Sequence, residues 1–258
     1  MERIGKASGA VKNHSILGVP IDATSYARAT DQILAWTRAG GGHCVYAANV
    51  HVLIEAQDHA DFMELLRRAD LVTPDGMPLV WMLRLKGVRS QPRVYGPDLM
   101  LRLLAAAAQA GIPVGFYGGA PEILEALVAR MQARFPGLNV PYAYSPPFRP
   151  LAAQEDAEII EAIRAAGVRI LFVGLGCPKQ ERWVDAHREN VAAVMVAVGA
   201  AFDFLAGNKH QAPAWMQRAG LEWLFRLFQE PGRLWKRYVS TNPRFILLAL
   251  LELLRKEP

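Results

Sequence analysis

The stretch Arg169-Ile-Leu-Phe-Val-Gly-Leu-Gly-Cys-Pro-Lys-Gln-Glu-Arg-Trp183 decides the fold predicted for this chain. Ile170 to Val173 is a continuous apolar run, typical of a strand buried on both faces of a parallel sheet. It stops at Gly174-Leu-Gly176, where the backbone can turn tightly and come close to a ligand. Pro178 suits the first turn of a helix, which we expect from about Lys179 to Glu189. Open α/β sheets bind ligands at this kind of strand-to-helix edge, although an ordinary turn would have the same local pattern.

The same pattern recurs along the chain. Apolar strand candidates end at glycine or polar turns and are followed by segments with apolar residues at helical spacing. The clearest of these strands are His43–Ala48, Pro113–Tyr117 and Ala192–Val198. Strands that alternate with helices predict an α/β fold, a Rossmann-like and mostly parallel sheet with helices on both faces.

The last fifth of the chain differs in composition. Residues 209–258 carry 9 Lys/Arg against 4 Asp/Glu, so the whole net charge of +5 lies there. We expect an aromatic helix at 214–228, a basic turn or helix at 233–240 and an apolar helix at 245–254, separated by Pro-containing breaks. The predicted organisation is a flexible N-terminus (1–13), a Rossmann-like domain (14–207) and a basic helical C-terminal appendage (208–258).

Two interpretations of this appendage stay open. Its aromatic and leucine side chains could pack on the main domain or on a neighbouring subunit. Alternatively, its basic and apolar residues could lie on an anionic membrane surface. No apolar run reaches the roughly 20 residues that span a bilayer, and the first residues do not form a signal peptide. The two cysteines, Cys44 and Cys177, make no disulfide framework, so a cytoplasmic protein is expected.

Polar groups follow several predicted strands and would share one edge of a parallel sheet. They are Asn49, Asp75, Gly118-Gly119, Gln180 and Asp203. A single Asp after a strand is more often a turn residue or a helix cap, but five such positions at one edge favour a site. The chain has no GxGxxG, no P-loop, no CxxC and no clear cluster of metal ligands.

Seven motifs occur in an order that resembles the WecG/TagA/CpsF glycosyltransferases over roughly residues 15–245. They are Val19-Pro-Ile-Asp22, Asn49, Ala69-Asp-Leu-Val-Thr-Pro-Asp-Gly76, Arg93-Val-Tyr-Gly-Pro-Asp-Leu99, Phe116-Tyr-Gly-Gly119, Gly174-Leu-Gly-Cys-Pro-Lys-Gln-Glu181 and Val198-Gly-Ala-Ala-Phe-Asp-Phe204. The resemblance implies inverting transfer of a sugar from a UDP-sugar to a saccharide on a polyprenyl diphosphate. This reaction takes place at the cytoplasmic face of the membrane, in cell-surface polysaccharide synthesis, with no metal or other cofactor.

The resemblance also implies roles for individual residues. Asp75 corresponds to the catalytic base, and Arg93, Gln180 and Asp203 to pocket residues, with Asp203 on the nucleotide side. Ala47 stands where relatives often carry Thr, so the substrate contact proposed there is in doubt.

A transfer without metal needs cations and backbone N–H groups to stabilise the departing diphosphate. Lys179 and the Gly118-Gly119 amides are further candidates, with Arg226, Arg233 and Arg237 of the appendage as a possible lid.

Other functions remain to be compared with the transferase. A Rossmann-type oxidoreductase or methyltransferase is disfavoured by the missing glycine fingerprint. A non-catalytic module could use the basic tail to bind nucleic acid or membrane, whereas the transferase interpretation predicts no nucleic-acid partner. The sequence leaves open N-acetylmannosamine, its uronic acid or glucose as the sugar, and a possible homo-oligomer.

Overall fold

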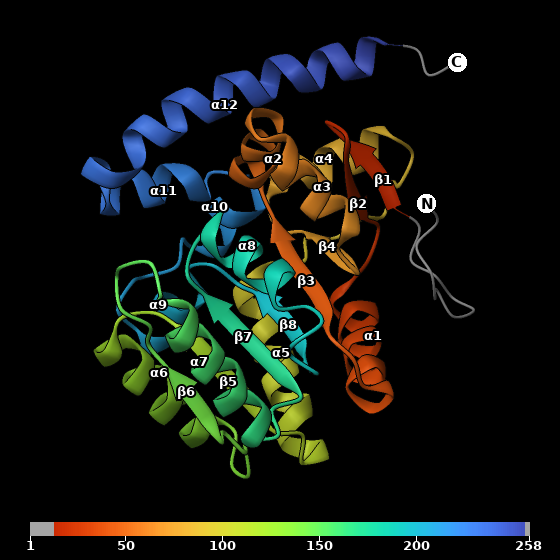
Figure 1. Ribbon diagram of the computed structural model, residues 1–258. Coiled ribbons are helices and arrows are strands. Elements are labelled where there is room, and N and C mark those ends of the chain that lie inside the picture. The colour runs from red at the N-terminus through yellow and green to blue at the C-terminus, as the bar shows by residue number, and fades with distance from the viewer. Residues whose placement is uncertain (1–12, 256–258) are drawn as a thin grey trace. The chain divides into compact units, whose positions relative to one another are not determined.

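The structure is a computed structural model that describes residues 13–255, and the chain forms two compact units (Figure 1). Among the described residues, the first unit combines 13–25, 48–95 and 211–255, and the second combines 26–47 and 96–210. Residues 1–12 of the predicted flexible N-terminus lie outside the described part. The contacts group the described part of the predicted appendage, from Gln211 onward, with 13–25 and 48–95.

The second unit contains the parallel sheet, in the order β3-β8-β7-β5-β6. Its strands are β3 (His43–Ala48, whose last residue is assigned to the first unit), β5 (Val114–Gly118), β6 (Tyr142–Tyr144), β7 (Ile170–Gly174) and β8 (Val194–Ala197). The side chains of β7 and β8 are almost entirely buried, as expected for strands covered on both faces.

Helices cover both faces of this sheet. They are α1 (Tyr26–Ala39), α5 (Gly96–Ala110), α6 (Pro121–Arg134), α7 (Ala153–Ala165), α8 (Lys179–Ala186) and α9 (Ala201–Ala206). Figure 1 shows α7 and α8 in front of the sheet and α5 behind it. The predicted α/β fold, a mostly parallel sheet between two helical layers, is therefore confirmed.

The first unit is built around a short hairpin and a set of helices. The hairpin pairs β1 (Asn13–Ile16) with β2 (Val19–Asp22) in antiparallel register. The other elements are α2 (Val50–Asp58), α3 (Ala60–Arg68), β4 (Leu71–Pro74), α4 (Met77–Leu85), α10 (Ala214–Arg218), α11 (Glu222–Gln229) and α12 (Pro231–Leu254). Buried Asp22 links the hairpin to β4, because its Oδ2 accepts the Val72 N–H at 2.7 Å.

The C-terminal helices differ from the sequence prediction. The single helix expected at 214–228 is two helices, α10 and α11, with Gly220 between them at φ +72°. The break expected at 231–232 is present, because α11 ends at Gln229 and α12 begins at Pro231. The break expected at 242–243 is absent, because α12 continues through Asn242 and Pro243. Pro231 occupies the first turn, where its missing N–H is not needed. Pro243 removes the hydrogen bond to the carbonyl of Val239, an exposed residue where water can replace it.

Contacts within the first unit hold α12 against α2 and the hairpin. Arg244 makes a two-pronged ion pair with Asp58 of α2, with N–O distances of 2.8 and 2.6 Å. Glu252 accepts the Leu17 N–H at 2.6 Å and pairs with Lys86 at 2.6 Å. Phe245 and Ala249 are buried on the inner face of α12.

Candidate functional site

In the first unit, Asp75 stands in a turn directly after β4. Its N–H donates to the Ala48 carbonyl at 2.9 Å, and the Gly76 N–H donates to the same oxygen at 3.3 Å. Asn49 follows Ala48, so the turn and Asn49 are neighbours. A Cβ on Gly76 would lie 3.3 Å from the Cβ of Asn49, which explains why glycine suits the position.

Asn49 has a structural role in addition to its predicted one. Its Oδ1 accepts the N–H groups of His51 and Val52 at 3.1 and 3.4 Å, which caps the first turn of α2. An N-cap satisfies backbone donors that have no partner within the helix. Asn49 is therefore a helix cap, and its substrate role stays a prediction.

Arg93 connects the Asp75 turn to the C-terminal helices. Its Nε donates to the carbonyl of Asp75, and its terminal nitrogens donate to Glu222 at 2.6 Å and Gln217 at 3.4 Å. The guanidinium also lies 4.0 Å from the centre of the Tyr95 ring. Burial disfavours the charged guanidinium, but Asp75 and Glu222 outweigh this, so the pKa of Arg93 is raised. Burial, followed by the negative charges of Glu222 and Asp75, raises the pKa of Tyr95.

Three arginines of α11 and α12 concentrate positive charge. Arg237 is partly buried, and its Nε has no hydrogen-bond partner among the described residues. Burial lowers the pKa of Arg237, and the charges of Arg226 and Arg233 lower it further. Arg233 donates to Glu230 at 2.8 Å. Mutual repulsion between guanidinium groups makes such a cluster favourable for an anion.

In the second unit, the loops after the strands are bound to one another. Gly118 and Gly119 have φ values of +118° and +75°, which side-chain-bearing residues rarely adopt. A Cβ on Gly118 would lie 2.6 Å from the Gly174 carbonyl oxygen, so β5 and β7 approach each other closely there. Ser145, after β6, donates to the Gly119 carbonyl at 2.6 Å. The two glycines therefore form a tight turn at the carboxyl edge of the sheet.

Gln180 joins two of these loops. Its Oε1 accepts the N–H groups of Gly176, after β7, and Gly199, after β8, each at 3.1 Å. Its Nε2 donates to the buried carboxylate of Glu181 at 2.8 Å. Both ends of this amide therefore have protein partners, so Gln180 shapes the edge of the sheet whatever else it binds.

Asp203 and Lys179 complete the predicted residues of the second unit. Asp203 accepts the side-chain N–H of Asn208 at 2.9 Å and pairs with Lys209 at 3.4 Å. Lys179 is exposed at the start of α8. Asn49, Asp75 and Arg93 thus meet in one unit, whereas Gly118, Gly119, Gln180 and Asp203 form the strand ends of the other. That both groups surround one uridine diphosphate stays a prediction.

Sequence reasoning missed Glu222, Gln217, Tyr95 and Ser145. A weak signal existed for Glu222, because it is one of only 4 acidic residues in the basic last fifth of the chain. Among the residues that the structure describes, no group of three His, Cys, Asp or Glu side chains could hold a metal ion. The expectation of a metal-free reaction stays a prediction.

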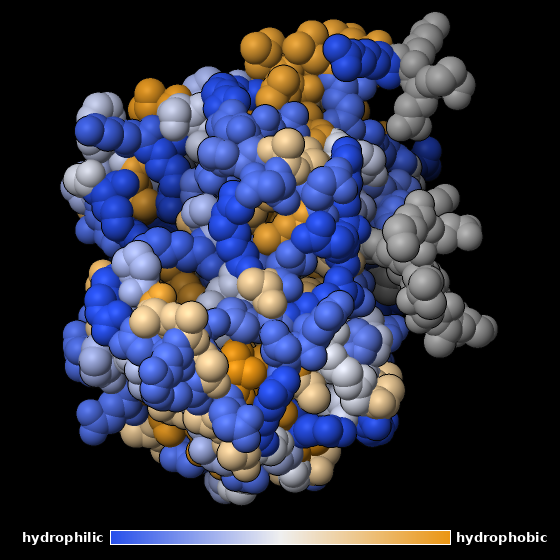
Figure 2. All heavy atoms as spheres, viewed as in Figure 1, coloured by the Kyte–Doolittle hydropathy of each residue, from blue (hydrophilic) through white to orange (hydrophobic). Residues whose placement is uncertain are grey.

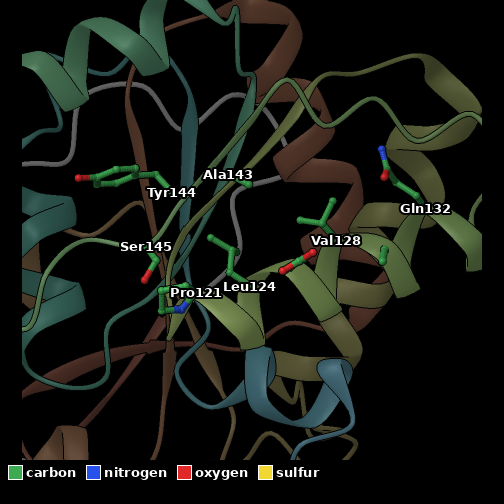
Figure 3. A pocket seen from close by; sticks show the side chains of 9 residues that line it. Pro121, Leu124, Val128, Gln132, Ala143, Tyr144 and Ser145 are labelled. Atoms are coloured by element: carbon green, nitrogen blue, oxygen red, sulfur yellow. The ribbon is translucent and has the colours of Figure 1, made fainter.

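A groove of about 480 Å³ lies between α6 and β6 in the second unit. Figure 3 shows Leu124 and Val128 along it, with Tyr144 and Ser145 at one end and Gln132 at the other. Its lining is mostly apolar, and Ser145 connects it to the Gly118-Gly119 turn.

Comparison with known proteins agrees with these motifs. The model of the glycosyl transferase WecG/TagA/CpsF family matches residues 14–258. A Bacillus subtilis protein named N-acetylglucosaminyldiphosphoundecaprenol N-acetyl-β-D-mannosaminyltransferase is 30% identical over 212 residues, 82% of this chain and 80% of that protein. A protein of the same name from Bacillus spizizenii is 32% identical over 210 residues, 81% of this chain and 79% of that protein.

Proposed function

Since the chain belongs to the WecG/TagA/CpsF family and is a glycosyltransferase, we propose that it transfers N-acetylmannosamine from a UDP donor to a lipid-linked N-acetylglucosamine. The observation that carries this proposal is the name shared by the two relatives, which match 82% and 81% of this chain. The acceptor sugar would be held on a polyprenyl diphosphate. Family membership favours this reaction over the oxidoreductase, methyltransferase and non-catalytic binding alternatives.

Asp75 is the proposed general base. In an inverting transfer, a carboxylate takes the proton of the attacking acceptor hydroxyl while the bond from the sugar to UDP breaks on the opposite face. Asp75 would need to come within about 3 Å of that hydroxyl. The hydrogen bonds to Ala48 and Arg93 hold the backbone of this residue, which supports a fixed place for its carboxylate.

The arginine cluster of α11 and α12 is the proposed partner of a diphosphate. Burial lowers the pKa of Arg237, the charges of Arg226 and Arg233 lower it further, and an anion would relieve this repulsion. Such side chains can stabilise the charge that builds on departing UDP without a metal ion. We propose that no metal takes part, and that Arg93 holds the backbone of Asp75 through its hydrogen bond to the Asp75 carbonyl.

The outer face of α12 is the proposed membrane contact. Ile246, Leu247, Leu250, Leu251 and Leu254 are between 45% and 78% exposed. Figure 2 shows apolar atoms gathered at the top of the molecule, where Figure 1 places the C-terminal half of α12. None of the helices in residues 13–255 is long and apolar enough to cross a membrane. A peripheral position on an anionic bilayer suits an apolar helix face that accompanies basic residues.

A donor screen tests the proposed reaction. UDP release is followed with UDP-N-acetylmannosamine, its uronic acid form and UDP-glucose, using a short polyprenyl-diphosphate-linked N-acetylglucosamine as acceptor. We expect turnover with the first donor, unchanged by EDTA. Asp75→Asn should lower kcat by about 10²–10⁴-fold while UDP still binds, and Asp58→Asn should leave turnover intact. No transfer from any donor, or full turnover by Asp75→Asn, would refute the proposal.

Vesicle sedimentation tests the membrane contact. Burying a leucine side chain contributes about 1.5–3 kcal/mol, so Leu247→Glu with Leu250→Glu should weaken binding to anionic vesicles at least tenfold. Phe148→Glu, at a 95% exposed position in the second unit, is the matched control and should bind as wild type. If the double variant keeps its vesicle binding but loses a dimer in ultracentrifugation, the face is a subunit interface instead.

A further inference from the structure

Glu222 is the first residue of α11, and its two carboxylate oxygens have different partners. Oε2 accepts from Arg93 at 2.6 Å, and Oε1 accepts the hydroxyl of Tyr95 at 3.0 Å. The side chains of Arg93 and Glu222 are each 15% exposed, so this ion pair is largely withdrawn from solvent. Water and salt screen such a pair only weakly, and removing one partner leaves the other as a poorly solvated charge.

The contact continues from Arg93 to the proposed base. The Nε of Arg93 donates to the carbonyl of Asp75, while the Asp75 N–H donates to Ala48. The neighbouring Val94 N–H also donates to the carbonyl of Pro74 at 3.1 Å. Backbone hydrogen bonds thus hold the chain on both sides of Asp75, and the side chain of Arg93 donates a further one to the Asp75 carbonyl.

We propose that Glu222 is a positioning residue for the transfer: it fixes the Arg93 guanidinium, and Arg93 fixes the Asp75 turn. The C-terminal segment would then set the place of the base even though it supplies no base itself. This inference rests on the proposed function of Asp75. A small displacement of a catalytic group can cost about 100-fold in rate, so the effect should appear in turnover.

Steady-state kinetics separates positioning from binding. Glu222→Ala should lower kcat about 10–100-fold with the donor KM unchanged within about threefold. Glu222→Gln keeps an acceptor oxygen and should recover part of kcat. Asp58→Asn breaks another ion pair between the C-terminal segment and the rest of the first unit, and should behave as wild type.

The kinetics can also overturn the inference. If Glu222 only occupies the place of a substrate phosphate on Arg93, Glu222→Gln should lower the donor KM and leave kcat unchanged. That result, or equal kcat in wild type and Glu222→Ala, would refute positioning.

Hydrogen exchange supplies a readout that does not depend on activity. The amides of Asp75 and Gly76 donate to Ala48, so they should exchange faster in Glu222→Ala than in wild type or Asp58→Asn. Unchanged exchange at these amides would overturn the inference even if transfer is confirmed. Faster exchange in a protein that transfers no sugar would refute the proposed function and leave the link from Glu222 to the turn intact.

Discussion

Replacing Gln180 by alanine should destabilise the second unit, because its amide connects two loops. The change removes the acceptor of the Gly176 and Gly199 N–H groups and the donor to Glu181. A buried group that loses its partner costs about 1–3 kcal/mol. Gly176 and Gly199 are only partly buried, so water can replace part of what they lose. With the lower end of the range for each lost partner, the free energy of unfolding should fall by about 3 kcal/mol.

Thermal unfolding followed by circular dichroism measures this loss. For a chain of this size about 1 kcal/mol shifts Tm by about 2–4 °C, so Gln180→Ala should melt about 6–12 °C below wild type. Gln154→Ala is the matched control, because Gln154 also lies in the first turn of a helix but is exposed and bonds only Glu158. It should stay within about 0.5 kcal/mol of wild type. A Tm for Gln180→Ala that matches this control would refute the structural role of the amide.

Two further predictions concern the second unit. Gly118→Ala should lower the free energy of unfolding by about 3–5 kcal/mol, because its Cβ would lie 2.6 Å from the Gly174 carbonyl oxygen at a φ of +118°. Gly137 has a positive φ but open space around it, so Gly137→Ala should lower the same free energy by only about 1–2 kcal/mol. Denaturant unfolding measures both losses. Arg149 donates to both carboxylate oxygens of Glu155, and the Ala152 N–H donates to one of them. These hydrogen bonds lower the pKa of Glu155 to about 2. Stability from this contact is therefore complete above the unfolded pKa and is lost as the pH falls through about 2. An NMR titration of the Glu155 carboxyl with a midpoint near 4 would contradict the contact.

The sequence determined the fold class, because its signals are local. Apolar runs such as Ile170–Val173 bury themselves on both faces, and the glycines after them end the strands. The same local pattern located Asp75 after a strand and Asn49 at the start of a helix. The charge count placed the basic residues in the last fifth of the chain.

Only the tertiary structure decided how these residues are used. Arg93 and Glu222 are 129 positions apart, and no periodicity connects them. The resemblance implied a pocket role for Gln180, but its amide partners come from loops that only the assembled sheet brings together. The continuity of α12 through Pro243 likewise depends on its packing against α2, since helix propensity alone favours a break. Local composition specifies elements, whereas the partners of a side chain depend on which distant segments fold against it.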